Sequence, residues 1–190
     1  MSLVVVPLAW FAVSVIAYGM TLSLGNMEGS IYTNGYSSAA ANLVSYLFIG
    51  PMANCLGRKK LLILSFFITG VVCMLYEPLS SLHIALTYVC LALGTFGATS
   101  AFNLVYIITT EVFPTVYRGT VFGFSNMMAR AGGILAPLID EVGKKNFMYV
   151  FGALGIAGAL VSLLVKETKG QVMADTAEEE RRKSGLINES

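Results

Sequence analysis

Charged residues are scarce in this sequence. Only 12% of its 190 residues are Asp, Glu, Lys or Arg, whereas about a quarter are charged in an ordinary soluble domain. Hydrophobic residues make up 56% of the chain, and its mean hydropathy is +0.73. Most of the surface is therefore expected to face lipid rather than water. The net charge of +1 provides no concentrated basic face, which excludes a nucleic-acid partner.

Residues that commonly serve in catalysis, metal binding or disulfide bonds are also few. The single histidine, His83, lies close to the end of an apolar run, and Cys55, Cys73 and Cys90 are widely spaced within apolar runs. An odd number of cysteines in such settings indicates small buried hydrophobic side chains rather than a disulfide or metal framework. The sequence has no cofactor motif and no Cys/His constellation. It predicts neither an enzyme nor a cofactor or metal site.

Long apolar runs are what the sequence has in abundance. A bilayer core of about 30 Å requires about 20 helical residues, and the first run is too long for a cleaved signal peptide. We predict an all-α integral membrane protein, a six-transmembrane-helix bundle over residues 1–169, followed by a polar tail at 170–190. The six runs are 3–24, 36–56, 61–76, 82–110, 119–139 and 147–165.

The basic residues predict the orientation of these spans. Cytoplasmic loops carry an excess of Lys and Arg, and with six alternating spans the opposite side holds only Lys144 and Lys145. Both termini are therefore expected on the cytoplasmic side. That side carries Arg58, Lys59, Lys60, Arg118, Lys166, Lys169, Arg181, Arg182 and Lys183.

Small residues four positions apart predict close packing between the helices, because they let two backbones approach. These pairs are Gly94 and Ala98, Gly97 and Ala101, Gly119 and Gly123, Gly132 and Ala136, and Gly155 and Ala159.

A set of local strings narrows the family. They are Leu-Gly-Arg-Lys-Lys at 56–60, Phe-Asn-Leu-Val-Tyr at 102–106, Glu-Val-Phe-Pro-Thr-Val-Tyr-Arg at 111–118, Ala-Arg-Ala-Gly-Gly-Ile-Leu-Ala-Pro at 129–137 and Glu-Thr-Lys-Gly at 167–170. In this order and spacing, the chain resembles the carboxy-terminal six-helix half of a major facilitator superfamily transporter of the organic cation and organic anion branch. The resemblance implies transmembrane transport of small organic ions.

The resemblance also implies a cytoplasmic charge network, in which charged motifs hold helix ends together in one state of the transport cycle. Its members here would be Arg58, Glu111, Arg118 and Glu167. Topological anchoring of ordinary loops is the alternative, because anchoring needs the same charges.

Arg130 is unusual because it lies within an apolar span. A central Arg costs about 2.5 to 3.5 kcal/mol on insertion scales, so such residues usually face a partner or a water-filled cavity. In the resembled family this span often carries a basic residue in anion-handling members, which favours a small organic anion as substrate. The other candidates for the substrate site are Tyr18, Asn103 and Tyr106. The alternative is an arginine paired with a carbonyl group or a neighbouring chain.

Two departures from the family weaken the case for transport. Asn42 and Val44 stand where the second span commonly has an acidic residue and a proline, and Lys166 replaces a proline. Transporters of this class also bind substrate between two six-helix halves. We therefore expect a half-size transporter that needs another six-helix half, or a non-transporting subunit of a larger membrane complex. The plasma membrane is the expected location, and the mitochondrial inner membrane is the alternative.

Overall fold

Every regular element in the described part of the chain is helical. The structure is a computed structural model, and it describes residues 2–113, 115–143 and 146–165. The predicted all-α fold is confirmed, whereas the predicted tail at 170–190 lies outside the described residues. The α-helices are α1 (Ser2–Leu22), α2 (Ile31–Leu56), α3 (Arg58–Ser80), α4 (Ile84–Val112), α5 (Thr115–Gly143) and α6 (Phe147–Ser162), and a 3-10 turn, η1 (Ser23–Gly25), follows α1.

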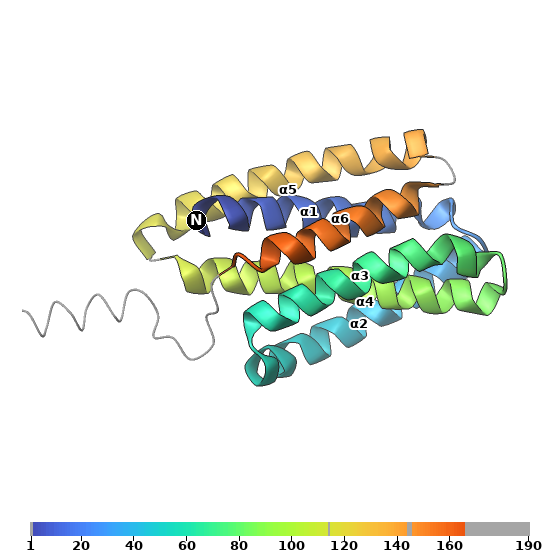
Figure 1. Cartoon of the computed structure of the whole chain (residues 1–190), viewed down its shortest axis with the longest axis horizontal. Coiled ribbons are helices and arrows are strands. Elements are labelled where there is room, and N and C mark those ends of the chain that lie inside the picture. Colours follow the sequence, from blue (N-terminus) through green and yellow to red (C-terminus); the bar gives the residue numbers. More distant parts are fainter. Residues whose placement is uncertain (1, 114, 144–145, 166–190) are drawn as a thin grey trace, which may run out of the picture.

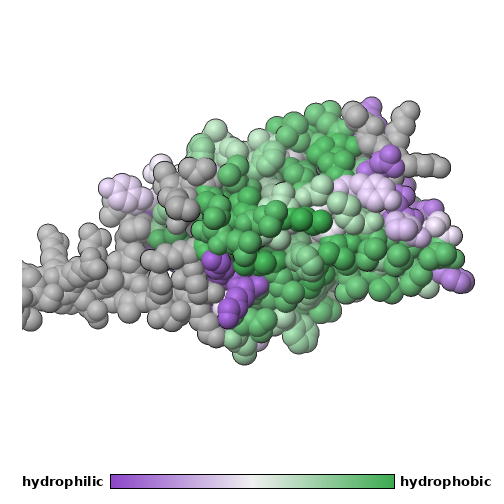
Figure 2. Space-filling model, viewed as in Figure 1, coloured by the Kyte–Doolittle hydropathy of each residue, from purple (hydrophilic) through white to green (hydrophobic). Residues whose placement is uncertain are grey.

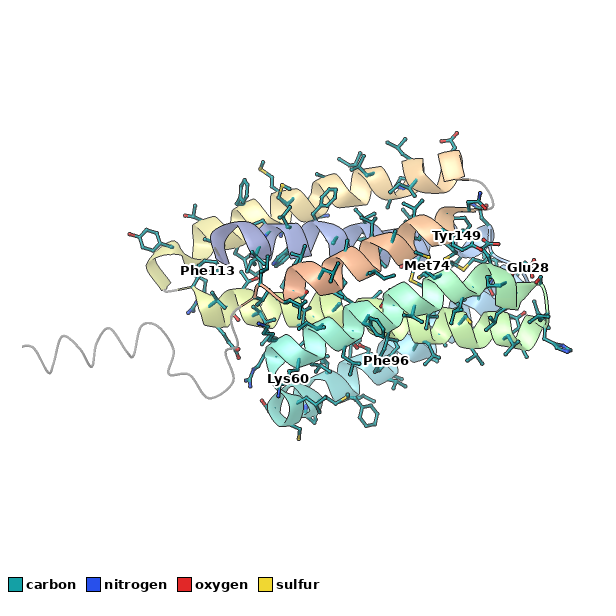
Figure 3. All side chains as sticks on the ribbon, in the orientation of Figure 1. Glu28, Lys60, Met74, Phe96, Phe113 and Tyr149 are labelled. Atoms are coloured by element: carbon teal, nitrogen blue, oxygen red, sulfur yellow. The ribbon has the colours of Figure 1, made fainter. Side chains whose placement is uncertain are left out.

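Successive helices run in opposite directions along one bundle (Figure 1), so α1 begins at the end where α6 finishes. Lys60 and Phe113 lie near this end, and Glu28 lies at the other (Figure 3). On the face seen in Figure 2, hydrophobic side chains cover most of the middle of the bundle, and polar residues gather towards its two ends. This distribution fits a bilayer that meets the middle of the bundle and water that meets its ends.

Four helices, α1 to α4, are long and apolar enough to cross a membrane by length and composition. The other two differ for separate reasons. Helix α5 has 29 residues, but it carries Arg118 and Arg130 among other polar residues, and α6 is apolar but only 16 residues long. Helix α3 exceeds the predicted run at both ends, since it begins with Arg58, Lys59 and Lys60 and continues to Ser80. Such basic side chains can extend to the headgroup region.

Two sequence signals set the sharp turns at the Lys60 end of the bundle. Gly57 connects α2 to α3 with φ of 93°, a conformation that glycine adopts without a steric penalty. Its backbone N–H donates to the carbonyl of Ala53 at 3.2 Å. Helix α4 ends at Val112, and Phe113 is extended because it precedes Pro114.

Glycine determines how closely the central helices pack. The most extensive contacts join α3 to α4, α1 to α5 and α3 to α6. A Cβ atom added to Gly155 of α6 would lie 2.7 Å from the Cα of Gly70 in α3, so these two backbones touch. By contrast, a Cβ added to Gly119 or Gly123 of α5 would meet no atom within 4 Å among the described residues. The predicted close packing therefore holds for Gly155 but not for this pair within the described bundle.

Helix α2 turns its small and polar side chains inward. It packs mainly on α4, and the hydroxyls of Ser45 and Ser100 lie 2.9 Å apart in a buried hydrogen bond between the two helices. Its large side chains, such as Tyr36 and Phe48, are exposed. This is the arrangement of a helix whose outer face meets lipid or another protein. The buried residues of α2 are Asn34, Ser38, Ala41, Ser45, Ile49 and Ala53.

Substitution Gly155→Ala is expected to destabilise the bundle by about 1 to 3 kcal/mol, because overpacking outweighs the better helix propensity of alanine. Unfolding of the reconstituted chain in bicelles would measure the loss. Gly35→Ala is the matched control, because a Cβ at Gly35 meets nothing within 4 Å. Equal stability of the two variants would contradict the close α3–α6 approach.

The orientation can be tested by labelling with a membrane-impermeant thiol reagent. Cysteines introduced at Ser30 and His83, both exposed at the Glu28 end, should react from one side of the membrane. The native Cys55 is exposed near the end of α2 and should react only from the other side. Labelling of all three positions from the same side would rule out the alternating bundle.

Candidate functional site

An aromatic wall joins α1, α4 and α5. Trp10 lies at its base, 1% exposed, and its indole N–H donates to Thr109 Oγ1 at 2.9 Å. The ring centroids of Trp10 and Tyr106 are 4.2 Å apart, and those of Trp10 and Phe122 are 5.3 Å apart in an edge-on contact. Trp10 is thus a packing residue, and it contacts Tyr106 directly.

Tyr18 continues this wall towards the surface. Its ring meets Phe102 edge-on with centroids 6.3 Å apart, and 39% of its surface is exposed. Gly133 of α5 makes room for the ring, since a Cβ there would lie 3.3 Å from Tyr18 Cδ2. Tyr18 therefore stands where α1, α4 and α5 meet.

Arg130 lies on the exposed face of α5 beside this wall. Together with Tyr18, Gly133 and Ile134 it lines an open recess of about 290 Å³. Tyr106 does not line the recess, and it is connected to Tyr18 through Phe102, whose ring centroid lies 5.3 Å from that of Tyr106. Among the described residues, no carboxylate forms an ion pair with Arg130. A guanidinium in such a recess can bind a carboxylate or another anion through two parallel hydrogen bonds.

Asn103 is placed differently from the other three predicted site residues. Its amide N–H₂ donates to the carbonyl of Thr99, one turn earlier in α4, at 2.9 Å. It does not line the recess around Arg130. The structure thus brings Arg130 and Tyr18 together in the recess and places Tyr106 in the adjoining aromatic wall, whereas the Asn103 side chain is engaged with its own helix.

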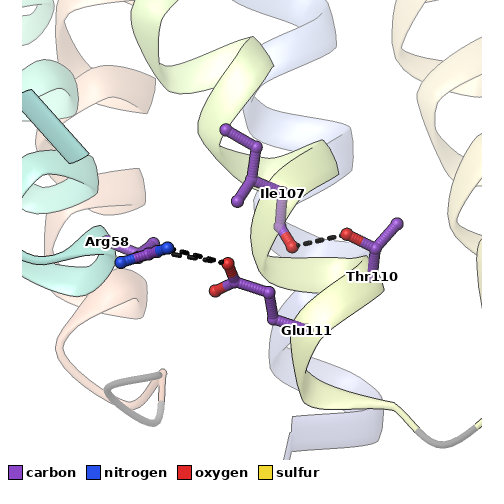
Figure 4. A network of polar contacts seen from close by, with 4 residues as sticks. All are labelled: Arg58, Ile107, Thr110 and Glu111. Atoms are coloured by element: carbon purple, nitrogen blue, oxygen red, sulfur yellow. Dashed lines mark hydrogen bonds and ion pairs between the residues drawn. The ribbon is translucent and has the colours of Figure 1, made fainter. Parts of the chain in front are cut away.

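The predicted charge network has one ion pair at its centre. Arg58 at the start of α3 lies 3.1 Å from Glu111 near the end of α4, measured from Nη2 to Oε1, and its Nε also donates to that oxygen at 3.2 Å (Figure 4). Both side chains are largely buried, at 20% and 22% exposure. In the same close-up, Thr110 donates to the carbonyl of Ile107 within the last turn of α4.

The other two predicted members differ from this pair. Arg118 is half-buried, and its Nε donates to the carbonyl of Phe113 at 3.2 Å, just after α4 ends. A cation at that point complements the negative end of the helix dipole. Glu167 lies outside the described residues. Helices α3 and α4 and the α4–α5 turn are therefore tied together at one end of the bundle.

Comparison with known families agrees with this arrangement. The family model described as Major Facilitator Superfamily matches residues 1–188. This chain belongs to the major facilitator superfamily. The bundle is thus a multi-pass, integral membrane part of that fold, and the lipid bilayer is its surroundings.

Several relatives in the superfamily have names that indicate their substrates. The chain is 32% identical over 173 residues to an organic cation transporter protein of Drosophila melanogaster, covering 90% of this chain and 32% of the relative. It is 34% identical over 181 residues to solute carrier family 22 member 15 of Xenopus tropicalis, covering 88% and 33%. The human organic cation/carnitine transporter 2 is 29% identical over 180 residues, covering 93% and 32%. The resemblance to the organic cation and organic anion branch is confirmed.

The chain spans about a third of the length of these relatives. They are transporters by name, and no enzyme is among them.

The sequence prediction missed part of the recess. Phe102 and Phe122 belong to the aromatic wall, and Gly133 and Ile134 line the recess itself. Helical spacing could have indicated two of them, since Phe102 lies four residues before Tyr106 and Gly133 three after Arg130. Nothing in the local sequence places Phe122 against Trp10, because that contact depends on how α5 packs on α1.

A double-mutant cycle on Arg58→Gln and Glu111→Gln should give a coupling free energy of about 1 kcal/mol, because the pair is largely shielded from water. Unfolding measurements on the two single variants and the double variant supply the three differences required. Additive effects would show that the two side chains do not stabilise the bundle through each other.

Proposed function

We propose that this chain forms the carboxy-terminal six-helix part of a transporter for small organic anions, with Arg130 as the group that binds the anion. The observation that carries the proposal is the placement of Arg130 in an open recess beside Tyr18. An arginine at mid-span is too costly to be kept in contact with lipid alone. An anionic ligand in the recess would compensate that cost.

The relatives' names point to organic cations and carnitine. The positive charge of Arg130 opposes binding of a simple cation in the recess, because like charges repel strongly in a site with little water. The family membership therefore supports transport of organic ions, and Arg130 supports anions among them. Tyr18 would supply a flat wall and a hydroxyl group for the body of the substrate.

Transport would require a second six-helix half, whether in the same protein or in another chain. The exposed face of α5 carries Arg130 in its recess, as well as Gly119 and Gly123, where a Cβ would meet no atom within 4 Å among the described residues. Lipid cannot satisfy the Arg130 guanidinium, whereas a second half would cover the recess and enclose a water-filled site. The two halves would then rock against each other, and the Arg58–Glu111 pair would keep α3 and α4 together as one rigid end. By family resemblance, the plasma membrane is the proposed location.

A non-transporting subunit of a larger membrane complex, in a membrane such as the mitochondrial inner membrane, is the second candidate function. Asn42 favours it, because this residue stands where the resembled family commonly has an intramembrane acid. Its Oδ1 accepts a hydrogen bond from Thr99, which gives Asn42 a role in joining α2 to α4. A subunit preserved for its scaffold would retain such a contact without moving substrate.

Substitution Arg130→Gln should lower uptake of an organic anion by at least about tenfold, because a charge-assisted hydrogen bond contributes about 1.5 to 3 kcal/mol. The assay would express the chain in cells together with the second six-helix half that transport requires, and measure uptake of radiolabelled hexanoate. Lys59→Gln is the matched control, because it removes a positive charge next to Lys60 at the end of the bundle, away from the recess.

Normal uptake by the Arg130→Gln variant would show that Arg130 does not bind the anion. Absence of uptake by the unsubstituted chain, together with its stable association with unrelated subunits, would favour the second candidate function.

A further inference from the structure

A groove separate from the Arg130 recess lies between α2, α3 and α4. Helices α2 and α3 both pack on α4, yet they make few contacts with each other. The gap between them is floored by α4 and has a volume of about 30 Å³. This is about the volume of one water molecule in the liquid, so the groove can hold part of a flexible chain but not a compact ring. Its walls include Ile49, Met52, Leu61, Leu64, Ile68 and Phe96.

The groove offers hydrocarbon rather than hydrogen-bonding groups to an occupant. No charged side chain lines it. Two serines contribute to its lining, but the hydroxyl of Ser100 is bonded to Ser45, and Ser65 is buried. Leu64, by contrast, is 40% exposed along the wall. An apolar chain is therefore the occupant that suits this part of the surface.

A positive charge precedes the groove on the same face of α3. Lys60, Leu64 and Ile68 follow one another at intervals of four residues, which places them along one side of the helix. Leu64 and Ile68 line the groove, whereas Lys60 lies at the end of the bundle, with Phe96 further along it (Figure 3). Helical side chains lean towards the helix N-terminus, so the Lys60 ammonium group is directed towards the headgroup level.

Lys60 is available to a ligand, unlike its neighbour Arg58. Its side chain is exposed, and among the described residues it forms no ion pair. Arg58, two positions earlier, is paired with Glu111. The face of α3 thus presents an open positive charge at the end of the bundle and an apolar groove next to it.

We propose that this groove binds an acidic phospholipid, with the headgroup phosphate at Lys60 and one acyl chain along Leu64 and Ile68. A soluble anion would match the charge but leave the groove empty, and a neutral lipid would fill the groove without pairing the lysine. The Lys60 end is the one predicted to be cytoplasmic, and acidic lipids are concentrated in the cytoplasmic leaflet. The inference does not depend on what the Arg130 recess binds.

The test compares two lipids that have identical acyl chains, phosphatidylglycerol and phosphatidylcholine. Native mass spectrometry of the full chain in mild detergent would measure the affinity for each. Phosphatidylglycerol should bind at least about fivefold more tightly, because one lysine near an anionic membrane surface contributes about that factor. Lys60→Gln should abolish this preference, and Lys60→Arg should keep it.

Matched variants separate the roles of the charge and the groove. Lys59→Gln removes the same charge but should keep the preference, because successive helical residues lie about 100° apart and Lys59 is off the face of Leu64 and Ile68. Ile68→Trp should fill the groove and weaken binding of both lipids. Its control is Phe67→Trp, because Phe67 is exposed and does not line the groove. Circular dichroism would check that each variant folds.

Photocrosslinking would identify the occupant directly. Replacing Leu64 by p-benzoylphenylalanine and irradiating the full chain in phosphatidylglycerol liposomes should give a lipid adduct. A cross-link to residues 170–190 or to a second copy of the chain would overturn the proposal and identify that segment or copy as the occupant.

Three binding results would also refute the proposal. They are equal affinity for the two lipids, a preference that Lys60→Gln retains, and equal lipid binding by Ile68→Trp and Phe67→Trp. The first two would rule out the headgroup contact, and the third would rule out the groove.

Discussion

The absence of water from the bilayer core is the constraint on which the rest of this structure depends. Every backbone N–H and C=O group there must be bonded within the protein, which leaves helices as the natural element. Burial of apolar surface cannot hold such helices together, because lipid tails are as apolar as leucine. The bundle relies instead on close backbone approach, as between Gly70 and Gly155, and on bonds between small polar side chains, as between Ser45 and Ser100.

This mode of packing explains the unusual outer helices. Since α2 is attached by a seam of small polar residues, its aromatic and aliphatic side chains are left on the outside. Helix α5 packs mainly on α1. Among the described residues, a Cβ at its Gly119 or Gly123 would meet no other atom within 4 Å. Both outer helices thus present faces that suit a partner as well as lipid. The recess around Tyr18 and Arg130 lies on one of these faces.

Arg58 and Arg130 occupy contrasting surroundings. Arg58 lies at the end of the bundle, paired with Glu111, and this pair joins two helix ends whatever else the protein does. Arg130 lies in mid-span, and no carboxylate pairs with it among the described residues. A charge that is paired within the protein contributes to structure, whereas a charge left open in a recess is available to a ligand. This difference, rather than the presence of either residue, separates the candidate site from the scaffold.

The sequence by itself determined the helical class, the number of helices and the alternation of their ends, because hydropathy and loop charge depend only on local composition. It also singled out Arg130, since a charge within an apolar run is conspicuous without any structure. It could not place Asn103, whose amide bonds to its own helix, nor reveal the groove between α2, α3 and α4. These features depend on which faces of α2, α3 and α4 meet. Only the tertiary structure decides that, because such contacts join residues distant in sequence through shapes that a periodic pattern does not record.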